Sequence, residues 1–312
     1  MFQDAIYLPY MHHIGISTAQ ISLYVIFKYI LVLAIEVPSG ILADRWSRKG
    51  VLSIALVSML VGLLIAANAH NFGVFILSGL FTSAYAAARS GLKEGMVYDA
   101  LLEMDQRSAY ERILSRLSFY SSIAAVASSL LGALLAAVFN FQSAFYAGSV
   151  TCLIAIVCLQ AFREPQLHRQ VETEKLFKHV ATLIRAISTS NEMKLLVIVG
   201  VLAGVEINYM QQLDQLWPIA LSLPVVLYGP LNALLGSAQS VPSLLIKKLI
   251  TRPSYVGFVG LVLILSACGL LIRNIIVVAT SEFLLLAFAT TLVVLLSGRV
   301  QDELSSSQRA GD

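Results

Sequence analysis

Charge is scarce in this chain: Asp, Glu, Lys and Arg together make up 12% of its 312 residues. A soluble globular domain carries roughly 25% charged residues, so the composition excludes an ordinary soluble domain. Hydrophobic residues account for 58% of the chain, and the mean hydropathy is +0.80. These proportions predict an all-α polytopic membrane protein, because apolar helices satisfy their own backbone hydrogen bonds inside a bilayer.

Patterns that carry catalysis or hold a cofactor are also missing from the sequence. It contains no nucleotide-binding loop, no metal-ligand spacing and no Ser-His-Asp or HExxH arrangement. Its three cysteines, Cys152, Cys158 and Cys268, lie inside apolar runs and are expected to act as small hydrophobes. The lysines and arginines form no basic patch, which argues against a nucleic-acid partner. We therefore expect neither an enzyme nor a cofactor-binding protein.

Apolar segments long enough to cross a bilayer, about 20 residues each, occur nine times. They are 17–41, 50–67, 72–92, 115–139, 143–162, 194–214, 219–246, 255–272 and 275–298. The connections alternate in charge, because 19 of the 21 lysines and arginines fall on one side of the predicted spans. By the positive-inside rule that side is cytoplasmic, which places the C-terminus inside the cell.

The connection between the first two full spans, EVPSGILADRWSRKG at 36–50, is the most informative motif. Gly40 allows two helix ends to approach closely, and Asp44 can cap a helix or pair with a cation. Three basic residues follow and hold the turn on the cytoplasmic side. The spacing Gly-x-x-x-Asp-Arg-x-x-Arg-Lys resembles the loop between the second and third spans of the major facilitator superfamily of secondary transporters. Ser47 departs from that pattern, because the family usually has a glycine there.

The resemblance implies a gating role for the charges at this end of the membrane. In the family, the aspartate of this loop pairs with the opposite half, and a basic residue of the loop meets an acid at the end of the fourth span. Those roles fall to Asp44, Arg48 and Asp99, whereas plain solvated loop charge is expected for Lys93 and Glu94. The full predicted gating set is Glu36, Gly40, Asp44, Arg45, Arg48, Lys49, Arg89 and Asp99.

An internal repeat predicts that the chain has two related halves. Val37-Pro38-Ser39 recurs 204 residues later as Val241-Pro242-Ser243, and the same offset carries the span 50–67 onto 254–271. We expect an N-terminal helical bundle at 1–162, a cytoplasmic amphipathic linker at 163–193 and a C-terminal bundle at 194–312. The superfamily places such a linker between two pseudo-symmetric bundles of six helices.

The same offset predicts that helices are missing at both ends. Run backwards from Lys194 it leaves the first helix incomplete, and run forwards from 115–139 and 143–162 it points beyond Asp312. The chain then matches about ten of the twelve helices of the family. A piece of a longer protein and a naturally shortened transporter are both open, and the first is the expectation.

Charged side chains at membrane depth are functional candidates, because they are costly unless paired or hydrated. Lys28 lies near the middle of 17–41, and Glu206 lies at similar depth in 194–214, beside Asn208 and Tyr209. Asp4 corresponds to Asn208 by the repeat. We predict that these five residues line a substrate or proton pathway, and a fixed structural ion pair is the alternative.

Together these observations predict a secondary active transporter that moves a small solute by alternating access. Proton coupling is compatible with the titratable Asp4, Glu36 and Glu206. The alternative is a truncated, non-transporting remnant or a regulatory partner of another membrane protein. The expected setting is the lipid bilayer of a cell membrane, the bacterial inner membrane in particular, with the protein as a monomer. The identity of the solute lies beyond the sequence.

Overall fold

The computed structural model describes residues 1–89, 92–164, 214–238 and 255–309, together with seven single residues between 194 and 207. Side chains beyond residue 293, those of 255–258 and that of Lys93 lie outside the description. The chain divides into two compact units. The first comprises Met1–Val171 and Pro224–Pro230, and the second comprises Glu172–Leu223 and Leu231–Asp312. Almost all of the expected linker at 163–193 falls outside the described residues.

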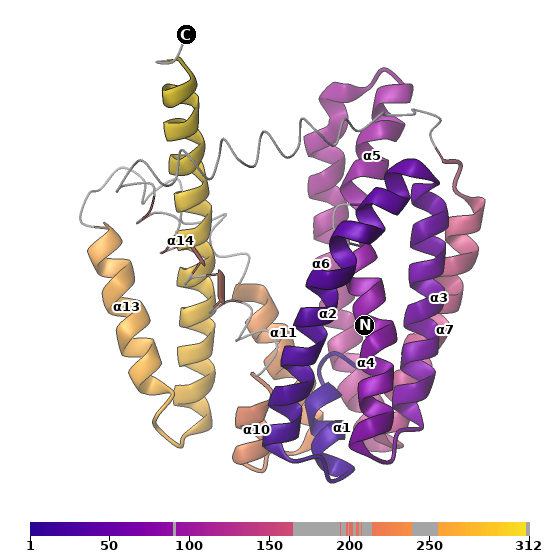
Figure 1. The fold of residues 1–312 in the computed structure, drawn as a ribbon. Coiled ribbons are helices and arrows are strands. Elements are labelled where there is room, and N and C mark those ends of the chain that lie inside the picture. The colour runs from indigo at the N-terminus through magenta and orange to yellow at the C-terminus, as the bar shows by residue number, and fades with distance from the viewer. Residues whose placement is uncertain are drawn as a thin grey trace. The chain divides into compact units, whose positions relative to one another are not determined.

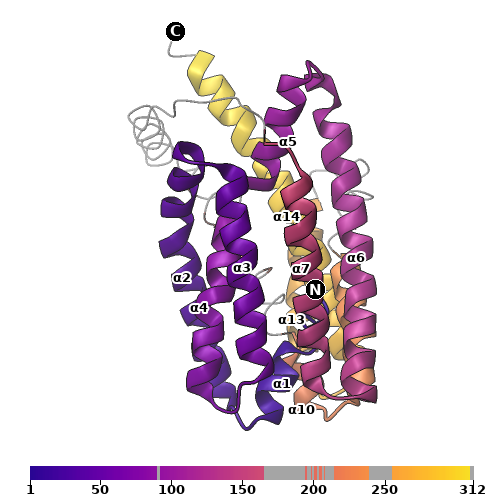
Figure 2. The same ribbon diagram turned by 90° about the vertical axis from the view of Figure 1, so that its right-hand side faces the viewer.

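The first unit consists of helices that run up and down past one another (Figures 1 and 2). They are α1 Tyr7–His13, α2 Thr18–Arg45, α3 Arg48–Ala67, α4 Phe72–Arg89, α5 Leu92–Glu103, α6 Tyr110–Val138 and α7 Phe141–Ala161, with a 3-10 turn η1 at Arg107–Ala109. α3 packs against α4 and α7, and α2 packs against α4. The short helix α5 lies at the same end as the turn between α2 and α3 (Figure 1).

Polar side chains fix where several of these helices begin. Ser17 and Gln20 form a reciprocal capping box at the start of α2. Ser47 caps α3 by accepting a hydrogen bond from the backbone N–H of Gly50 at 2.8 Å, and Asn140 caps α7 in the same way. Ser47 therefore supplies a helix cap at the position where the family usually has a glycine. The chain makes the turn after Trp46 and starts α3 without that glycine.

In the second unit the described helices are shorter, apart from the last. They are α10 Leu216–Ala220, the 3-10 turn η2 Val225–Leu227, α11 Tyr228–Ala238, α13 Tyr255–Gly269 and α14 Ile275–Arg309, with η2 and the first turn of α11 grouped with the first unit. α13 and α14 form a hairpin in which a Cβ added at Gly269 would collide with Ser281 Oγ. Leu235, Leu285 and Leu286 belong to the core of this unit.

Six helices in the described part of the chain are long and apolar enough to cross a membrane. They account for the predicted spans 17–41, 50–67, 72–92, 115–139, 143–162 and 275–298. The predicted span 255–272 corresponds to the shorter α13. The predicted span 219–246 is interrupted in its described part, because Ser222 has a positive φ of 54° and Pro224 follows it. Most of 194–214 lies outside the described residues.

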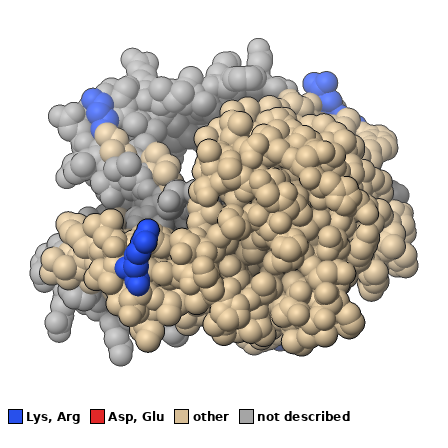
Figure 3. Space-filling model, turned by 90° about the horizontal axis from the view of Figure 1, so that it is seen from below, with Lys and Arg blue, Asp and Glu red and all other residues tan. Residues whose placement is uncertain are grey.

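The surface of the first unit agrees with a bilayer environment. On α2 the side chains of Leu23, Ile26, Ile30, Leu33 and Val37 recur at helical spacing and are 54% to 70% exposed. An apolar stripe of this kind is unfavourable in water and favourable against lipid. The end of the molecule seen from below shows few described lysine or arginine side chains (Figure 3), in line with the charge asymmetry of the sequence. The protein is therefore a multi-pass membrane protein.

Candidate functional site

Arg48 joins two helices through ion pairs at one end of the first unit. Its Nη1 lies 2.5 Å from Asp99 Oδ2 on α5, and its Nη2 lies 3.1 Å from Asp44 Oδ1 on α2. The side chain of Asp99 is 12% exposed and that of Asp44 is 32% exposed. Exposed pairs of this type contribute about 0.2–1 kcal/mol, and the Asp99 pair is the shorter and the more buried of the two. The structure thus brings together the three residues that the family motif singled out.

A glycine on α5 makes room for the guanidinium of Arg48. A Cβ added at Gly95 would lie 2.7 Å from Arg48 Nη1, closer than a carbon atom can approach without displacing it. At Gly40, in contrast, an added Cβ would meet no atom within 4 Å. Gly40 therefore does not make the close approach that the sequence predicted, and beside the Arg48 ion pairs the glycine that does is Gly95.

A second set of contacts ties the turn between α2 and α3 to the end of α7. Glu164 accepts hydrogen bonds from Ser47 Oγ at 2.6 Å and from the backbone N–H of Lys49 at 3.2 Å. The ammonium of Lys49 donates to the backbone carbonyls of Gln160 at 2.9 Å and Phe162 at 2.7 Å. A cation at the C-terminal carbonyls of a helix is favourable, because the helix dipole is negative there.

The other predicted gating residues lie apart from the Arg48 ion pairs. Arg45 is exposed, and the guanidinium of Arg89 lies 5.9 Å from the ring centroid of Tyr85. Glu36 is half-buried, two residues before Pro38 within α2, and its backbone carbonyl accepts a hydrogen bond from Ser39 Oγ at 3.0 Å. A gating role for these three residues remains a prediction.

Lys28, the cation predicted at membrane depth, lies against an aromatic cluster. Its Nζ is 5.4 Å from the ring centroid of Tyr7 on α1 and 5.7 Å from that of Tyr24 on α2. The two hydroxyl groups hydrogen-bond to each other, and Phe75 of α4 meets both rings edge-on. A cation over an aromatic ring is stabilised by about 0.5–2 kcal/mol, whereas a lysine at mid-membrane depth costs at least about 2.5–3.5 kcal/mol.

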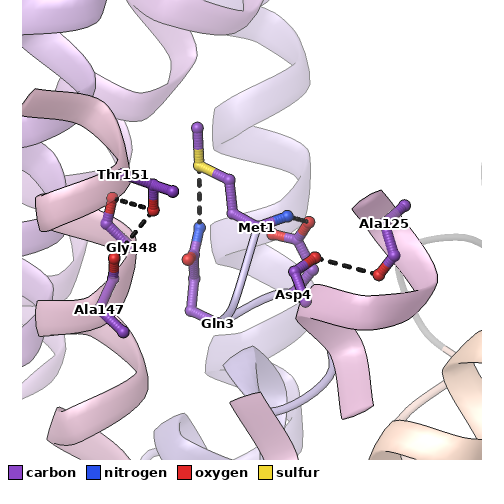
Figure 4. Close-up of polar contacts among 8 residues, drawn as sticks. Met1, Gln3, Asp4, Ala125, Ala147, Gly148 and Thr151 are labelled. Carbon is purple, nitrogen blue, oxygen red and sulfur yellow. Dashed lines mark hydrogen bonds and ion pairs between the residues drawn. The ribbon is translucent and has the colours of Figure 1, made fainter. Parts of the chain in front are cut away.

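The N-terminal segment carries Asp4 next to this cluster. Asp4 Oδ2 lies 2.5 Å from the amino group of Met1, and the amide of Gln3 donates to the sulfur of Met1 at 3.5 Å (Figure 4). The side chain of Asp4 is 56% exposed, and its charge acts on Lys28. Asp4 precedes α1 and therefore does not lie within a membrane-length helix in the described structure.

Glu206, Asn208 and Tyr209 lie outside the described residues, so the predicted partnership of Lys28 with Glu206 stays a prediction. The second unit instead shows two buried carboxyl groups that sequence reasoning missed. Asp214 is 8% exposed and accepts a hydrogen bond from the N–H of Gln215 at 2.8 Å, and Glu282 on α14 is 4% exposed. Glu282 Oε1 has no hydrogen-bond partner in the described part, and the charge of Asp214 acts on Glu282.

Groups of three or more His, Cys, Asp or Glu that could hold a metal ion do not occur among the described residues. The chemistry that the arrangement offers is therefore that of ion pairs, hydroxyl groups and buried carboxyl groups. Such groups can bind a charged solute, take up a proton or hold two helices together reversibly.

Several helices of membrane length, with an ion-paired charged turn between two of them, define the class of polytopic membrane proteins. The sequence profile of the Major Facilitator Superfamily matches residues 4–310. The chain belongs to that superfamily.

Solved structures with a similar fold are transporters. The nucleoside transporter NupG is 15% identical, with a TM-score of 0.69 over 95% of this chain and 76% of its own. A bacterial homologue of the human lysosomal transporter Spinster, in an inward-facing and occupied conformation, is 12% identical, with a TM-score of 0.69 over 94% of this chain and 69% of its own. The peptide transporter POT is 15% identical, with a TM-score of 0.63 over 93% of this chain and 76% of its own.

Among curated sequences, an uncharacterized transporter of Buchnera aphidicola is 24% identical over 152 residues. That match covers 48% of this chain and 37% of the relative, so the chain spans well under two thirds of the curated relative's length. These comparisons place the fold and the family. They leave the solute and the driving force to be argued from the residues.

Proposed function

We propose that this protein is a secondary active transporter that moves a small solute by alternating access, with protons as the coupling ion. The observation that carries the proposal is Arg48 held between Asp44 and Asp99, which ties α2, α3 and α5 together at one end of the first unit. Partly exposed ion pairs are weak enough to break and reform. A contact that closes one side of a transporter in one state and opens in the other must have that property.

The proposed setting is the inner membrane of a bacterium, with the protein as a monomer and its C-terminus in the cytoplasm. The support for this orientation is the bias of lysine and arginine toward one set of connections. Two exposed residues report on it: the proposed topology puts Gln106, between α5 and η1, in the cytoplasm and His70, between α3 and α4, outside the cell.

Labelling of single cysteines tests the orientation. In a variant whose Cys152, Cys158 and Cys268 are replaced by serine, we expect His70→Cys to react with a membrane-impermeant thiol reagent in intact cells. Gln106→Cys should react only after the membrane is permeabilised, because its connection carries cytoplasmic positive charge. Labelling of Gln106→Cys in intact cells would invert the proposed topology.

Proton coupling is supported by the two buried carboxyl groups of the second unit. A carboxylate removed from water is destabilised, and a second carboxylate nearby destabilises it further. Binding a proton relieves both effects at Glu282, whose Oε1 has no hydrogen-bond partner among the described groups. Glu36, Asp4 and Glu206 remain further candidates for the same role.

Replacing Glu282 with glutamine is expected to uncouple transport from the proton gradient. The variant should carry solute at the same rate with and without an imposed pH gradient, because glutamine cannot take up or release a proton. Uptake into proteoliposomes, with and without a protonophore, measures this. Ser266→Ala removes another buried polar group of the same unit and serves as the control, which should stay coupled. A Glu282→Gln variant that still responds to the gradient would move the coupling group elsewhere.

Vectorial uptake or efflux of a panel of radiolabelled solutes by the reconstituted protein tests the proposed function itself. We expect accumulation of at least one solute above its equilibrium level when a proton gradient is imposed. Failure to move any solute, in either direction, would favour the alternative of a truncated, non-transporting remnant.

A further inference from the structure

The surroundings of Lys28 are rich in hydrogen-bond donors. The hydroxyl groups of Tyr7 and Tyr24 share one hydrogen bond, which leaves the hydrogen of one of them available to a ligand. The Ser78 hydroxyl lies beside that of Tyr7 and is fully buried, and it makes no hydrogen bond of good geometry within the described part of the chain. Thr82 lies next to both tyrosines but donates to the carbonyl of Gly79 at 3.3 Å. An ammonium and several hydroxyl groups in one place suit an anion.

A permanent counter-charge for Lys28 is missing from the described residues. No carboxylate lies within 4.0 Å of its Nζ there, and Asp4, whose charge reaches it, is bound to the amino group of Met1. The residues of α4 next to the cluster are Phe75, Ser78 and Thr82, which carry no charge. The rings of Tyr7 and Tyr24 hold the ammonium in place without neutralising it.

The packing around this group is tight, which fixes its geometry. The ring of Tyr24 is 1% exposed and lies against Gly79 of α4, where an added Cβ would be 2.6 Å from Tyr24 Cε2. Lys28 follows Tyr24 by one turn on the same face of α2. A charge held on a rigid scaffold with unused donors beside it is prepared for a ligand and costs little to organise.

We propose that Lys28, together with the hydroxyl groups of Tyr7 and Tyr24, binds a carboxylate or phosphate group of the transported solute. The solute is then an organic anion, and its negative charge completes the ion pair that Lys28 lacks. This assignment rests on the proposed transport function and narrows its substrate class. Release of the solute leaves Lys28 unpaired again, so binding of the next anion is favourable.

Thermal stabilisation of the purified full chain by small solutes tests the anion site without knowledge of the natural solute. The probes are matched pairs of an acid and its uncharged counterpart: succinate and succinamide, benzoate and benzamide, glucose 6-phosphate and glucose, with inorganic phosphate added. We expect at least one acid to raise the melting temperature while its uncharged counterpart does not. Stabilisation by none of the acids, or equally by both members of each pair, would overturn the assignment.

Variants of the cluster separate anion binding from a structural role. Lys28→Met should weaken binding of the stabilising acid at least about tenfold, since it removes a charge-assisted contact, and Lys28→Arg should retain it. Tyr7→Phe keeps the ring under Lys28 and removes a hydroxyl, so it should weaken binding while lowering the melting temperature of the free protein only slightly, through the loss of one hydrogen bond to Tyr24. Unchanged binding in Lys28→Met, with the protein folded, would contradict the proposal.

Asp4→Asn distinguishes a fixed ion pair from an open site. If Asp4 were the permanent counter-charge of Lys28, this variant would gain anion binding that the unaltered protein lacks, and the proposal would fail. If the site is open as proposed, the unaltered protein already binds the acid and Asp4→Asn binds it at least as well. The transport assay remains separate: uptake of only uncharged solutes, unaffected by Lys28→Met, would reject the anion site and leave the transporter. Stabilisation by acids without uptake of any solute would support the anion site and reject the transport function.

Discussion

Replacing Arg48 with alanine is expected to reduce solute transport at least tenfold while leaving the protein in the membrane. The substitution removes both ion pairs and strands the carboxylate of Asp99, whose side chain is 12% exposed. An unsatisfied buried polar group costs about 1–3 kcal/mol and a charged one more, so the state that the Arg48 contacts stabilise should lose population by roughly tenfold to more than a hundredfold. Initial uptake rates in proteoliposomes, normalised to protein content, measure the effect.

Two further variants separate the gating role from a simple loss of stability. Arg48→Ala combined with Asp99→Asn removes the stranded charge, so it should recover thermal stability without recovering transport. Arg48→Lys keeps one charge but cannot reach Asp44 and Asp99 through two separate nitrogens, and we expect intermediate transport. Transport that returns together with stability in the double variant would show that the Arg48 contacts are structural only.

Introducing leucine at Gly62 is expected to destabilise the first unit by roughly 1–3 kcal/mol, the usual cost of overpacking. α3 and α4 are in close contact there: an added Cβ would lie 2.8 Å from Thr82 Cγ2 and 3.2 Å from the backbone carbonyl oxygen of Ser78. The helices would have to separate, because the carbonyl oxygen cannot move without breaking its own helix. Thermal unfolding of the purified protein in detergent measures the loss.

Gly260 on α13 offers the matched control for this substitution. A Cβ added there would meet no atom within 4 Å, so Gly260→Leu should leave the melting temperature nearly unchanged. Equal destabilisation by both substitutions would mean that leucine harms any helical glycine position in this protein. Loss confined to Gly62 would identify the α3–α4 contact as the cause.

The pairing of Arg48 with Asp99 could be read from the sequence because a family motif specifies it. The contacts of Gly95 and Glu164 with the same turn could not be predicted from the sequence. Gly95 lies 47 positions after Arg48, and Glu164 lies 117 positions after Ser47. No local pattern relates residues at such separations, and only the packing of α5 and α7 beside the turn brings them together. Glu164 does leave a faint signal, since an acid follows the basic Arg163 directly after a predicted span.

The membrane depth of Lys28 was likewise visible in the sequence, whereas its aromatic neighbours were not. Tyr7 reaches it because the chain turns back after α1 through Gly15, whose φ of 85° is disfavoured for residues with a side chain. Hydropathy also locates apolar stretches better than helix ends. α14 continues through Arg309, past the predicted limit at 298, because polar residues can extend a helix beyond the apolar region.

The chain contains two tryptophans, and the structure places one in each unit. Trp46 is 61% exposed at the turn between α2 and α3, two residues from Arg48, and Trp217 lies in α10. The protein therefore carries its own optical reporters. In a Trp217→Phe variant all tryptophan emission comes from the turn that holds Arg48, so its intensity and quenching by iodide follow the exposure of that turn. Opening of the gate can then be timed in the unlabelled protein while a solute or proton gradient is applied.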